Sequence, residues 1–471
     1  METDYDVIVI GGGGAGLAAA FTALEQGARV LIAEAGDRLG GSTNLSGGHI
    51  YAAGTSVQRA AGVEGDDPEA AFRYYMTLNQ YRLDPSLARR LCHEAPKVID
   101  WLIGLGVEFL PDKLHVGGVD GLRREHVPTG YGAAIVAVLE AAISGKADVA
   151  LRTRVRELLV EDGRVAGVRF GDEAVRAGSV VVTTGGFGAN PELLARHYPD
   201  AARHGDWTWY IGAPHSQGDH LELGAAAGAE VVGHNRGLVL ATPGFRKELE
   251  VYQPGWLMFV NREGRRFVDE TLPYHVMVGI IEEQTGGEGF AIFDEAARAA
   301  ACPDPETLAE VKAGFLTTSW LPEALEEFVR TRKLATAPSL EALARQVGIR
   351  WPALQTTVET YNGYCEAELD PQFGKAASEW KPIATPPFYA ARMRGAIVCF
   401  TSTGLRIDAE AQVHDKADRA IPGLYAAGES AGGVLGDRIF GGGSSMANVL
   451  VYGRIAGGNA AKHARSNGPP G

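Results

Sequence analysis

The chain has 471 residues, of which 45% are hydrophobic and 22% are charged, so it resembles a globular protein with a large core. Its net charge of −14 argues against nucleic acid or an anionic membrane as a partner. No apolar run reaches the roughly 20 residues that span a bilayer. The four cysteines are scattered without a Cys-x-x-Cys pair, which indicates neither a metal site nor a disulfide framework. We therefore expect a cytoplasmic protein without a signal peptide, because the first strand begins near the first residue.

A glycine loop near the amino end is the strongest motif of the chain. A β-branched run leads into Gly11–Gly16, an alanine-rich helix follows, and a second apolar run ends at Glu34. This order is the βαβ fingerprint of a dinucleotide site. Gly11 permits the tight turn, Gly13 lets the backbone approach a pyrophosphate, and Gly16 allows close packing of helix and strand. The helix amino end then faces the phosphates and Glu34 faces a ribose, whereas the alternative is an ordinary glycine-rich turn.

The remaining elements follow from apolar spacing and turn residues. In chain order we predict a helical region over 67–107, strands over 149–151, 164–170 and 179–183, short helices over 306–313, 321–331, 339–347 and 352–368, a strand from 421, and a last helix ending near 460. The Asp162-Gly163 pair predicts a hairpin turn between the first and second of these strands. The residues 236–389 are interpreted as an inserted domain between 1–235 and 390–471, and the tail 466–471 as unstructured.

Several motifs together resemble the fumarate reductase and succinate dehydrogenase flavoprotein superfamily. Besides the glycine loop, they are the segments 40–48, 181–190, 217–219, 260–270, 423–429 and 452–457. The resemblance covers nearly the whole chain. It implies an α/β fold in which a Rossmann-like FAD-binding domain is interrupted by an α+β capping domain that carries the substrate.

The FAD contacts of that superfamily can be carried over to matching positions. The resemblance implies Gly11, Gly13, Gly14, Ala15, Gly16, Glu34 and Ala35 for the pyrophosphate and ribose, Gly41, Ser42, Thr43, Ser46, Gly47 and Gly48 for the isoalloxazine, Val155, Thr184 and Gly185 for the adenine half, and Asp219, Gly428, Glu429, Ser445 and Met446 for the other contacts. Some of the hydroxyl side chains could instead serve only as turn and cap residues. Succinate dehydrogenases attach FAD through a histidine in the stretch that matches 40–42. No histidine stands there, so we expect non-covalent FAD.

The substrate site departs from the fumarate reductase pattern. Tyr274 occupies the position of the proton-donating arginine, and the segment 398–403 lacks the substrate-binding histidine of that family. The segment 240–244 likewise differs from the family's His-Pro-Thr element. A clamp for two carboxylates needs charge-assisted bonds. One cation remains as a candidate for it, Arg438, so we expect a less cationic and more apolar site.

The arrangement Glu270-x-x-Pro-Tyr274 instead resembles 3-ketosteroid dehydrogenases and related cyclic-ketone desaturases. In those enzymes a tyrosine at this place removes a proton next to the substrate carbonyl. A tyrosine has an ordinary pKa of about 10 and needs a helper to do so. We predict Tyr274 as the base, the backbone of Gly441 and Gly442 with the turn to 443 as the carbonyl anchor, and Arg438, Tyr131 or Tyr389 as helper. Phe440 stands near the place of a second, ketone-binding tyrosine.

Three functions remain open. The first is an FAD-dependent dehydrogenase that introduces a C=C bond beside a ring ketone, with an external electron acceptor such as oxygen, a quinone or a redox protein. The second is a reductase of an alkenoic acid of the fumarate or urocanate kind, for which Arg438 and Arg394 would form the acid clamp. The third is an electron-transfer component without a substrate, against which the large cap argues. The cluster Arg123, Arg124 and His126 is interpreted as a solvated loop rather than a part of the pocket.

Overall fold

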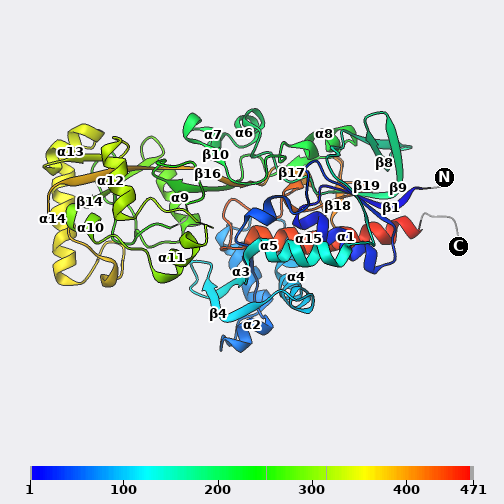
Figure 1. Ribbon diagram of the computed structural model, residues 1–471, viewed down its shortest axis with the longest axis horizontal. Helices are drawn as coiled ribbons and strands as arrows, with labels where there is room; N and C mark the ends of the chain where they lie inside the picture. The colour runs from blue at the N-terminus through cyan, green and yellow to red at the C-terminus, as the bar shows by residue number, and fades with distance from the viewer. Residues whose placement is uncertain (1–2, 251, 315, 467–471) are drawn as a thin grey trace. The chain divides into compact units, whose positions relative to one another are not determined.

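The computed structural model describes residues 3–250, 252–314 and 316–466 (Figure 1). Residues 467–471 of the tail that the sequence predicts to be unstructured lie outside them. The chain folds into two compact units. The first contains residues up to Asp200, Gly212–Leu238 and those from Cys399 onward, and the second contains Ala201–Ile211 and Val239–Val398. Each unit is described below by itself.

A mostly parallel sheet forms the centre of the first unit. Its strands run in the order β18 (Gln412–His414), β19 (Ala420–Ala426), β9 (Glu173–Val182), β1 (Tyr5–Ile10), β2 (Val30–Ala33) and β6 (Asp148–Ala150). The β1, β2 and β19 residues are largely buried, as expected for β-branched runs covered on both faces. The helices α1 (Gly14–Glu25) and α15 (Ser444–Ser466) pack against each other and the sheet. A side chain at Gly457 would overlap the Ala19 carbonyl, so α15 needs glycine there.

The hairpin at Asp162-Gly163 is present, but one of its arms differs from the prediction. It joins β7 (Glu157–Glu161) to β8 (Arg164–Phe170), and β8 continues antiparallel onto β9. The predicted first strand is β6, which pairs in parallel with β2 instead. The sequence does not reveal β7, because this five-residue strand has a glutamate at each end and only a weak alternation of buried and exposed side chains.

A helical layer and a small sheet complete the first unit. The region predicted as helical over 67–107 holds α3 (Pro68–Leu78) and α4 (Pro85–Gly104), which Asp67 and Asp84 cap at their amino ends. The sequence did not predict the three-stranded sheet β3 (Ile50–Tyr51), β5 (Arg123–Pro128) and β4 (Phe109–Val116). Further elements of this unit are α2 (Ser56–Ala60), α5 (Tyr131–Ile143), α6 (Pro191–His197), α8 (Asp219–Ala226), β11 (Val231–Val232), β17 (Gly404–Arg406) and β20 (Ala431–Gly432).

The second unit is built on a six-stranded sheet. It contains β10 (Trp209–Tyr210), β16 (Phe388–Thr401), β14 (Glu288–Asp294) and β13 (Met258–Val260), and β12 (Gly237–Thr242) and β15 (Ala335–Ala337) pair with β16. Its helices are α9 (Tyr274–Glu282), α10 (Glu295–Ala299), α11 (Pro305–Lys312), α12 (Pro322–Arg330), α13 (Leu340–Val347) and α14 (Trp351–Ala367). The short α7 (Pro199–Ala202) crosses the boundary between the units. The four short helices that the sequence predicts between 306 and 368 are all present.

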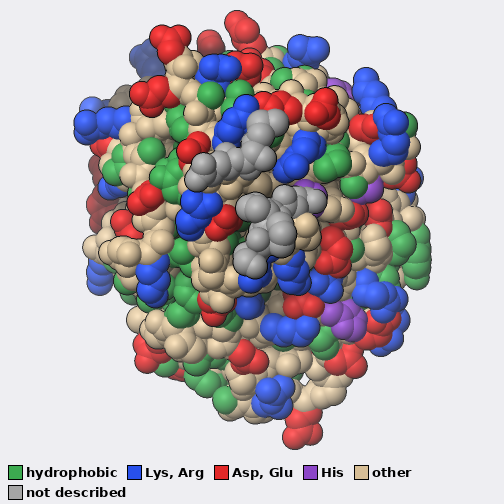
Figure 2. Space-filling view, turned by 90° about the vertical axis from the view of Figure 1, so that its right-hand side faces the viewer, with side chains coloured by type: hydrophobic (Ala, Val, Ile, Leu, Met, Phe, Trp, Pro, Cys, Tyr) green, Lys and Arg blue, Asp and Glu red, His purple; other side chains and the backbone are tan. Residues whose placement is uncertain are grey.

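Two further observations concern the described helices and the charged side chains of the surface. Within the described ranges, no helix combines the length and the apolar character needed to cross a membrane. Figure 2 shows acidic and basic side chains interspersed over the face that it presents, without a large region of one sign. The fold is the mixed α/β class that the sequence predicts.

Candidate functional site

The glycine loop between β1 and α1 has the geometry of a phosphate cradle. A Cβ atom at Gly11, where φ is +99°, or at Gly16 would overlap neighbouring backbone, so both positions require glycine. Gly13 is the residue before α1, and a Cβ atom there would meet no atom within 4 Å. The space in front of the first turn of α1 is therefore open. This fits a pyrophosphate bound by the free N–H groups of a helix amino end.

Glu34 follows β2 directly and anchors the same loop. Its carboxylate is buried and accepts hydrogen bonds from the N–H groups of Gly12 at 2.7 Å and Gly36 at 2.6 Å. A carboxylate offers about four lone-pair directions, so two bonds leave acceptor capacity for ribose hydroxyls. Glu34 thus shapes the loop as well as meeting the requirements of the ribose site predicted from the sequence.

The segment 40–48 folds against the same loop. It contains a turn of 3₁₀ helix, Gly41–Leu45, in which Thr43 Oγ1 accepts a hydrogen bond from the Gly14 N–H at 3.3 Å. Ser42 Oγ accepts one from the Ala213 N–H at 2.9 Å. Ser46 Oγ donates to the Thr43 carbonyl at 2.8 Å, so all three hydroxyl groups have partners in the fold. Ser42 and Thr43 therefore stabilise local backbone, which is the alternative role considered for them from the sequence.

The residues assigned to the other cofactor contacts lie at the carboxyl ends of parallel strands. Thr184 and Gly185 follow β9, and Glu429 follows β19 closely. Ligands of open α/β sheets bind at this edge. Burial raises the pKa of Glu429 to about 7, although the Thr401 N–H donates to its carboxylate at 3.1 Å. Asp219, at the start of α8, forms an ion pair with Arg154 at 2.5 Å.

The Gly441-Gly442-Gly443 turn precedes α15, and two of its amides already have partners. The Gly441 N–H donates to Ser444 Oγ at 3.2 Å and the Gly442 N–H donates to the Gly117 carbonyl at 3.1 Å. For Gly443, where φ is +86°, no amide partner is found among the described residues. A carbonyl anchor in this turn would therefore use the Gly443 amide.

The two residues before this turn have different environments. Phe440 is buried between the rings of Tyr51 and Tyr75, with centroid distances of 4.4 and 4.1 Å, so it belongs to the core. Arg438 is exposed, and Asn79 holds its backbone by accepting from the N–H at 3.0 Å and donating to the carbonyl at 2.8 Å. The fixed backbone and exposed guanidinium leave Arg438 as a candidate contact for an anionic group.

Tyr274 is the first residue of α9 in the second unit. Its side chain is half-buried, and its ring meets that of His275 edge to face at 5.4 Å. A side chain in the first turn of a helix lies near the positive end of the helix dipole, which favours a negatively charged phenolate. The position of Tyr274 at the start of α9 is therefore compatible with the predicted role as the base that removes a proton from the substrate.

Tyr389, considered as a helper, and Arg394, considered for the acid clamp, have structural partners within the second unit. Tyr389 donates to Glu295 at 2.6 Å, and burial raises its pKa to about 12. Arg394 donates twice to the buried carboxylate of Glu288, at 2.9 and 2.6 Å, and its guanidinium lies 4.8 Å from the ring centre of Trp207. Both side chains are therefore occupied in stabilising the fold of this unit.

The cluster interpreted as a solvated loop is in fact largely buried. Arg124 is 1% exposed and pairs with Asp66 at 2.6 Å and Asp120 at 2.8 Å. His126 is also 1% exposed, and burial lowers its pKa to about 4. Both lie on β5 of the small sheet that the sequence did not predict. That interpretation was wrong because the residues read as a loop form the middle strand of this sheet.

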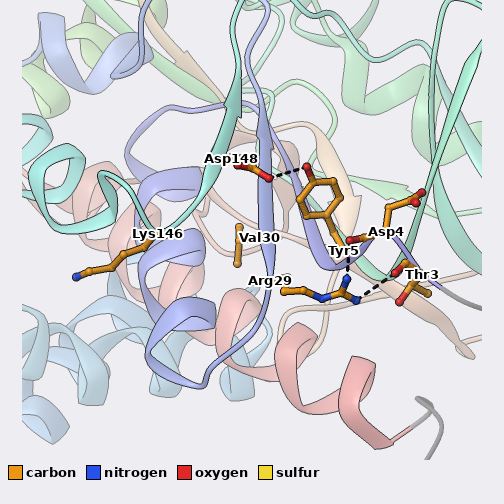
Figure 3. A pocket seen from close by; sticks show the side chains of 7 residues that line it. All are labelled: Thr3, Asp4, Tyr5, Arg29, Val30, Lys146 and Asp148. Carbon is orange, nitrogen blue, oxygen red and sulfur yellow. Dashed lines mark hydrogen bonds between the residues drawn. The ribbon is translucent and has the colours of Figure 1, made fainter.

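A hollow of about 480 Å³ lies at the opposite edge of the first unit's main sheet. Figure 3 shows Tyr5 and Arg29 pointing into it from the amino ends of β1 and β2, with Tyr5 donating to Asp148 at 2.7 Å. Cofactors of open α/β sheets bind at the carboxyl ends of the strands. This hollow is therefore distinct from the site described above.

Comparison with known protein families gives one match over most of the chain. A model described as an FAD binding domain matches residues 6–445. The chain belongs to the fumarate reductase and succinate dehydrogenase flavoprotein superfamily. Its glycine loop, with the open space at Gly13, fits FAD, which is the cofactor of this oxidoreductase family. The recognition, the cofactor and the enzyme class expected from the sequence are confirmed.

Curated members of the superfamily include both reductases and dehydrogenases. The fumarate reductase (cytochrome) of Shewanella frigidimarina is 31% identical over 98% of this chain and 78% of its own length. The chain spans about half (48%) of the NADH:fumarate oxidoreductase of Klebsiella pneumoniae, to which it is also 31% identical. The 3-oxosteroid 1-dehydrogenase of Mycolicibacterium smegmatis is 26% identical over 96% of both chains.

A solved structure of a dehydrogenase has a closely similar fold. The 3-ketosteroid-Δ4-(5α)-dehydrogenase from Rhodococcus jostii RHA1 matches with a TM-score of 0.76 and 27% identity, over 98% of both chains. Both reductases and ketosteroid dehydrogenases are therefore similar to this chain over nearly its whole length.

Proposed function

We propose that this protein is an FAD-dependent dehydrogenase that introduces a C=C bond α,β to the carbonyl of a cyclic ketone. The substrate is a ketosteroid or a smaller ring ketone. The observation that carries the proposal is Tyr274, which stands where fumarate-type members have an arginine and begins helix α9. We also propose that the protein works in the reducing cytoplasm, in agreement with four cysteines that form no disulfide.

The residues would divide the chemistry as follows. A C–H bond next to a carbonyl is acidified because the resulting carbanion is delocalised as an enolate. Tyr274 takes that proton, and the dipole of α9 favours its ionised form. The Gly443 amide donates a hydrogen bond to the carbonyl oxygen as negative charge develops there. Bound FAD would supply the acceptor for the hydride on the adjacent carbon.

The pairing of Tyr274 with the glycine turn rests on their motifs, since each resembles the corresponding segment of ketosteroid dehydrogenases. The two residues belong to different units of the fold. The glycine turn is attached to the small sheet through the Tyr51 N–H, which donates to the Gly443 carbonyl. Glu270, four residues before Tyr274, forms buried ion pairs with Arg266 and Lys375. An external electron acceptor completes each turnover, and oxygen, a quinone or a redox protein would serve.

Reduction of an alkenoic acid is the second candidate, which the 31% identity to fumarate reductases favours. It needs cations that bind a carboxylate. Arg394 is held by Glu288, so Arg438 is the arginine of this pair that would contact the acid. A clamp with one arginine would suit a substrate with a single carboxylate better than fumarate.

Anaerobic titration of the purified flavoprotein separates the two candidates. Oxidised enzyme is mixed with a panel of cyclic ketones, with and without a carboxylate, while the flavin absorbance is followed. Bleaching by a ketone supports the dehydrogenase. Absence of bleaching by every ketone, together with reoxidation of the reduced enzyme by alkenoic acids, contradicts it and supports the reductase.

A further inference from the structure

One face of the small sheet lies directly against the glycine turn before α15. Tyr51 of β3 is opposite Glu125 of β5 in the antiparallel register. Side chains alternate along a strand, so His49 shares the face of these two residues. A Cβ atom at Gly441 would overlap the Tyr51 ring, and one at Gly442 would overlap the Glu125 carboxylate. Both glycines are therefore needed for this close approach.

His49 and Glu125 form a pair on this face. His49 Nδ1 lies 2.7 Å from Glu125 Oε1. Glu125 is 8% exposed, whereas the side chain of His49 is 28% exposed. A carboxylate withdrawn from water needs a positive partner or several donors. The imidazole, rather than the carboxylate, is the more exposed member of the pair.

Two other charged or titratable side chains lie near this pair. Arg124, next to Glu125 in the chain, pairs with Asp66 and Asp120, and its Nη1 also donates to the Tyr51 hydroxyl at 3.0 Å. The His115 ring on β4 lies 6.4 Å from that of His49, edge to face. Glu125 pairs with His49 at hydrogen-bond distance.

His49 adjoins two segments that the sequence assigns to the cofactor and the substrate, with its ring near the first and its backbone near the second. A Cβ atom built on Gly47, predicted to line the isoalloxazine, would be 2.9 Å from His49 Nε2. A Cβ atom on Gly443 would be 2.7 Å from the His49 backbone. The Tyr51 N–H donates to the Gly443 carbonyl at 3.2 Å, which fixes the turn to the sheet.

The proposed carbonyl anchor has few donors without this histidine. Phe440 has no hydroxyl group, and the amides of Gly441 and Gly442 donate within the fold. One amide, that of Gly443, is a weak counterpart for a full negative charge. A nearby imidazolium would supply the remaining stabilisation, and preorganised groups of this kind typically contribute about 10²–10³-fold in rate.

We propose that His49, held as an imidazolium by Glu125, stabilises the negative oxygen that develops on the substrate carbonyl. Glu125 is its positioning residue. This inference rests on the proposed function and extends it to the ligand class, which is a planar compound whose oxygen carries negative charge beside the flavin. A phenolate is a stable mimic of such an enolate.

Binding of 4-nitrophenol to the oxidised holoenzyme tests this inference without turnover. At a fixed pH near the phenol's own pKa, absorbance reports the ionised ligand and the perturbed flavin spectrum reports binding. We expect the wild type to bind the phenolate, and His49→Gln to bind it at least tenfold more weakly. Glu125→Gln keeps the shape but loses the charge and weakens binding in the same direction. His49→Lys restores a cation and recovers part of the binding.

His115→Gln is the matched control, because it removes the imidazole opposite Glu125 in the β4–β5 register and leaves both members of the His49–Glu125 pair in the chain. Its phenolate binding should equal that of the wild type. Each variant is compared at equal FAD content and circular dichroism, which separates loss of charge from loss of fold. Absence of phenolate binding by the wild type, or unchanged binding by His49→Gln with full FAD, overturns the inference.

The outcomes also separate this inference from the proposed function. If no ketone bleaches the flavin but phenolate binding depends on His49, the dehydrogenase proposal fails and the charge assignment stands. If ketone oxidation depends on Tyr274 but phenolate binding is unchanged in His49→Gln, the dehydrogenase proposal stands and the assignment of a positive charge to His49 fails.

Discussion

Arg266 and Glu270 form a two-pronged buried ion pair, with Nε–Oε1 at 2.9 Å and Nη2–Oε2 at 2.8 Å. Asp370 and Lys375 extend the pair into a network at 2.7 Å and 3.0 Å, with all four side chains at most 2% exposed. Glu270 also accepts from the Phe259 N–H at 3.0 Å. Tyr274 lies four residues further on, so the network fixes the chain that leads to the proposed base.

Breaking this network should destabilise the second unit strongly. Removing one partner of a buried ion pair leaves an uncompensated charge and typically costs about 3–5 kcal/mol. We expect Glu270→Ala to lower the free energy of unfolding by that amount, as measured by urea denaturation. The control is Glu341→Gln, which breaks the exposed pair with Arg345 and should cost less than about 0.5 kcal/mol. Equal effects of the two substitutions would contradict the structural role.

Replacing Tyr274 by phenylalanine should spare FAD and abolish most turnover. Loss of a general base typically lowers the rate about 10²–10⁴-fold. We expect Tyr274→Phe to retain the flavin spectrum and to lower kcat by at least about 10²-fold in a ketone-dependent dye-reduction assay. Tyr389→Phe is the control, because that hydroxyl is bonded to Glu295. A Tyr274→Phe enzyme with wild-type kcat would rule out the base assignment.

Glu34 should govern retention of FAD. Its substitution by alanine removes the predicted ribose acceptor and also the bonds to the Gly12 and Gly36 amides. We expect Glu34→Ala to lose flavin during gel filtration, measured as the ratio of flavin absorbance to protein absorbance. Glu34→Gln keeps an acceptor oxygen and should lose less. Full flavin occupancy in the alanine variant would count against the ribose role.

Gly13 offers a test of the cradle that leaves the apo fold intact. Its φ is −72° and a Cβ atom there meets no protein atom within 4 Å, so alanine fits the free chain. The methyl group would occupy the space assigned to the pyrophosphate. We expect Gly13→Ala to weaken FAD binding at unchanged stability of the apoprotein. Gly104→Ala, also open within 4 Å, should leave FAD binding unchanged. Unaltered FAD affinity of Gly13→Ala would place the pyrophosphate elsewhere.

Glu250 should make the stability of the second unit depend on pH. Burial raises its pKa to about 7 from an ordinary 4.5, although Ser319 donates hydrogen bonds to both its oxygens. Between these values the folded state holds a proton that the unfolded state has released, so stability falls as pH rises through this window. The loss is at most about 3 kcal/mol. We expect Glu250→Gln to flatten the curve of unfolding midpoint against pH across this window. An unchanged slope would mean that Glu250 does not titrate there.

The sequence alone was sufficient to predict those elements of this protein whose conformation depends on residues close together in the chain. The glycine loop, the βαβ order, the short helices between 306 and 368 and the Asp162-Gly163 turn each depend on backbone conformations or periodicities within a few residues. The chain could therefore be assigned to an FAD-binding superfamily from its motifs. The same motifs identified Tyr274 as a departure from the reductase pattern.

Tertiary structure decided the features that depend on residues far apart in the chain. The pairing of β3 with β5 joins Ile50 to His126, and it buries Arg124 and His126 where the sequence suggested a solvated loop. The same pairing brings His49 within hydrogen-bond distance of Glu125 and places both residues next to the Gly441–Gly443 turn. No periodicity encodes such a contact, because its energy comes from burial and from charges that meet only after the strands have paired.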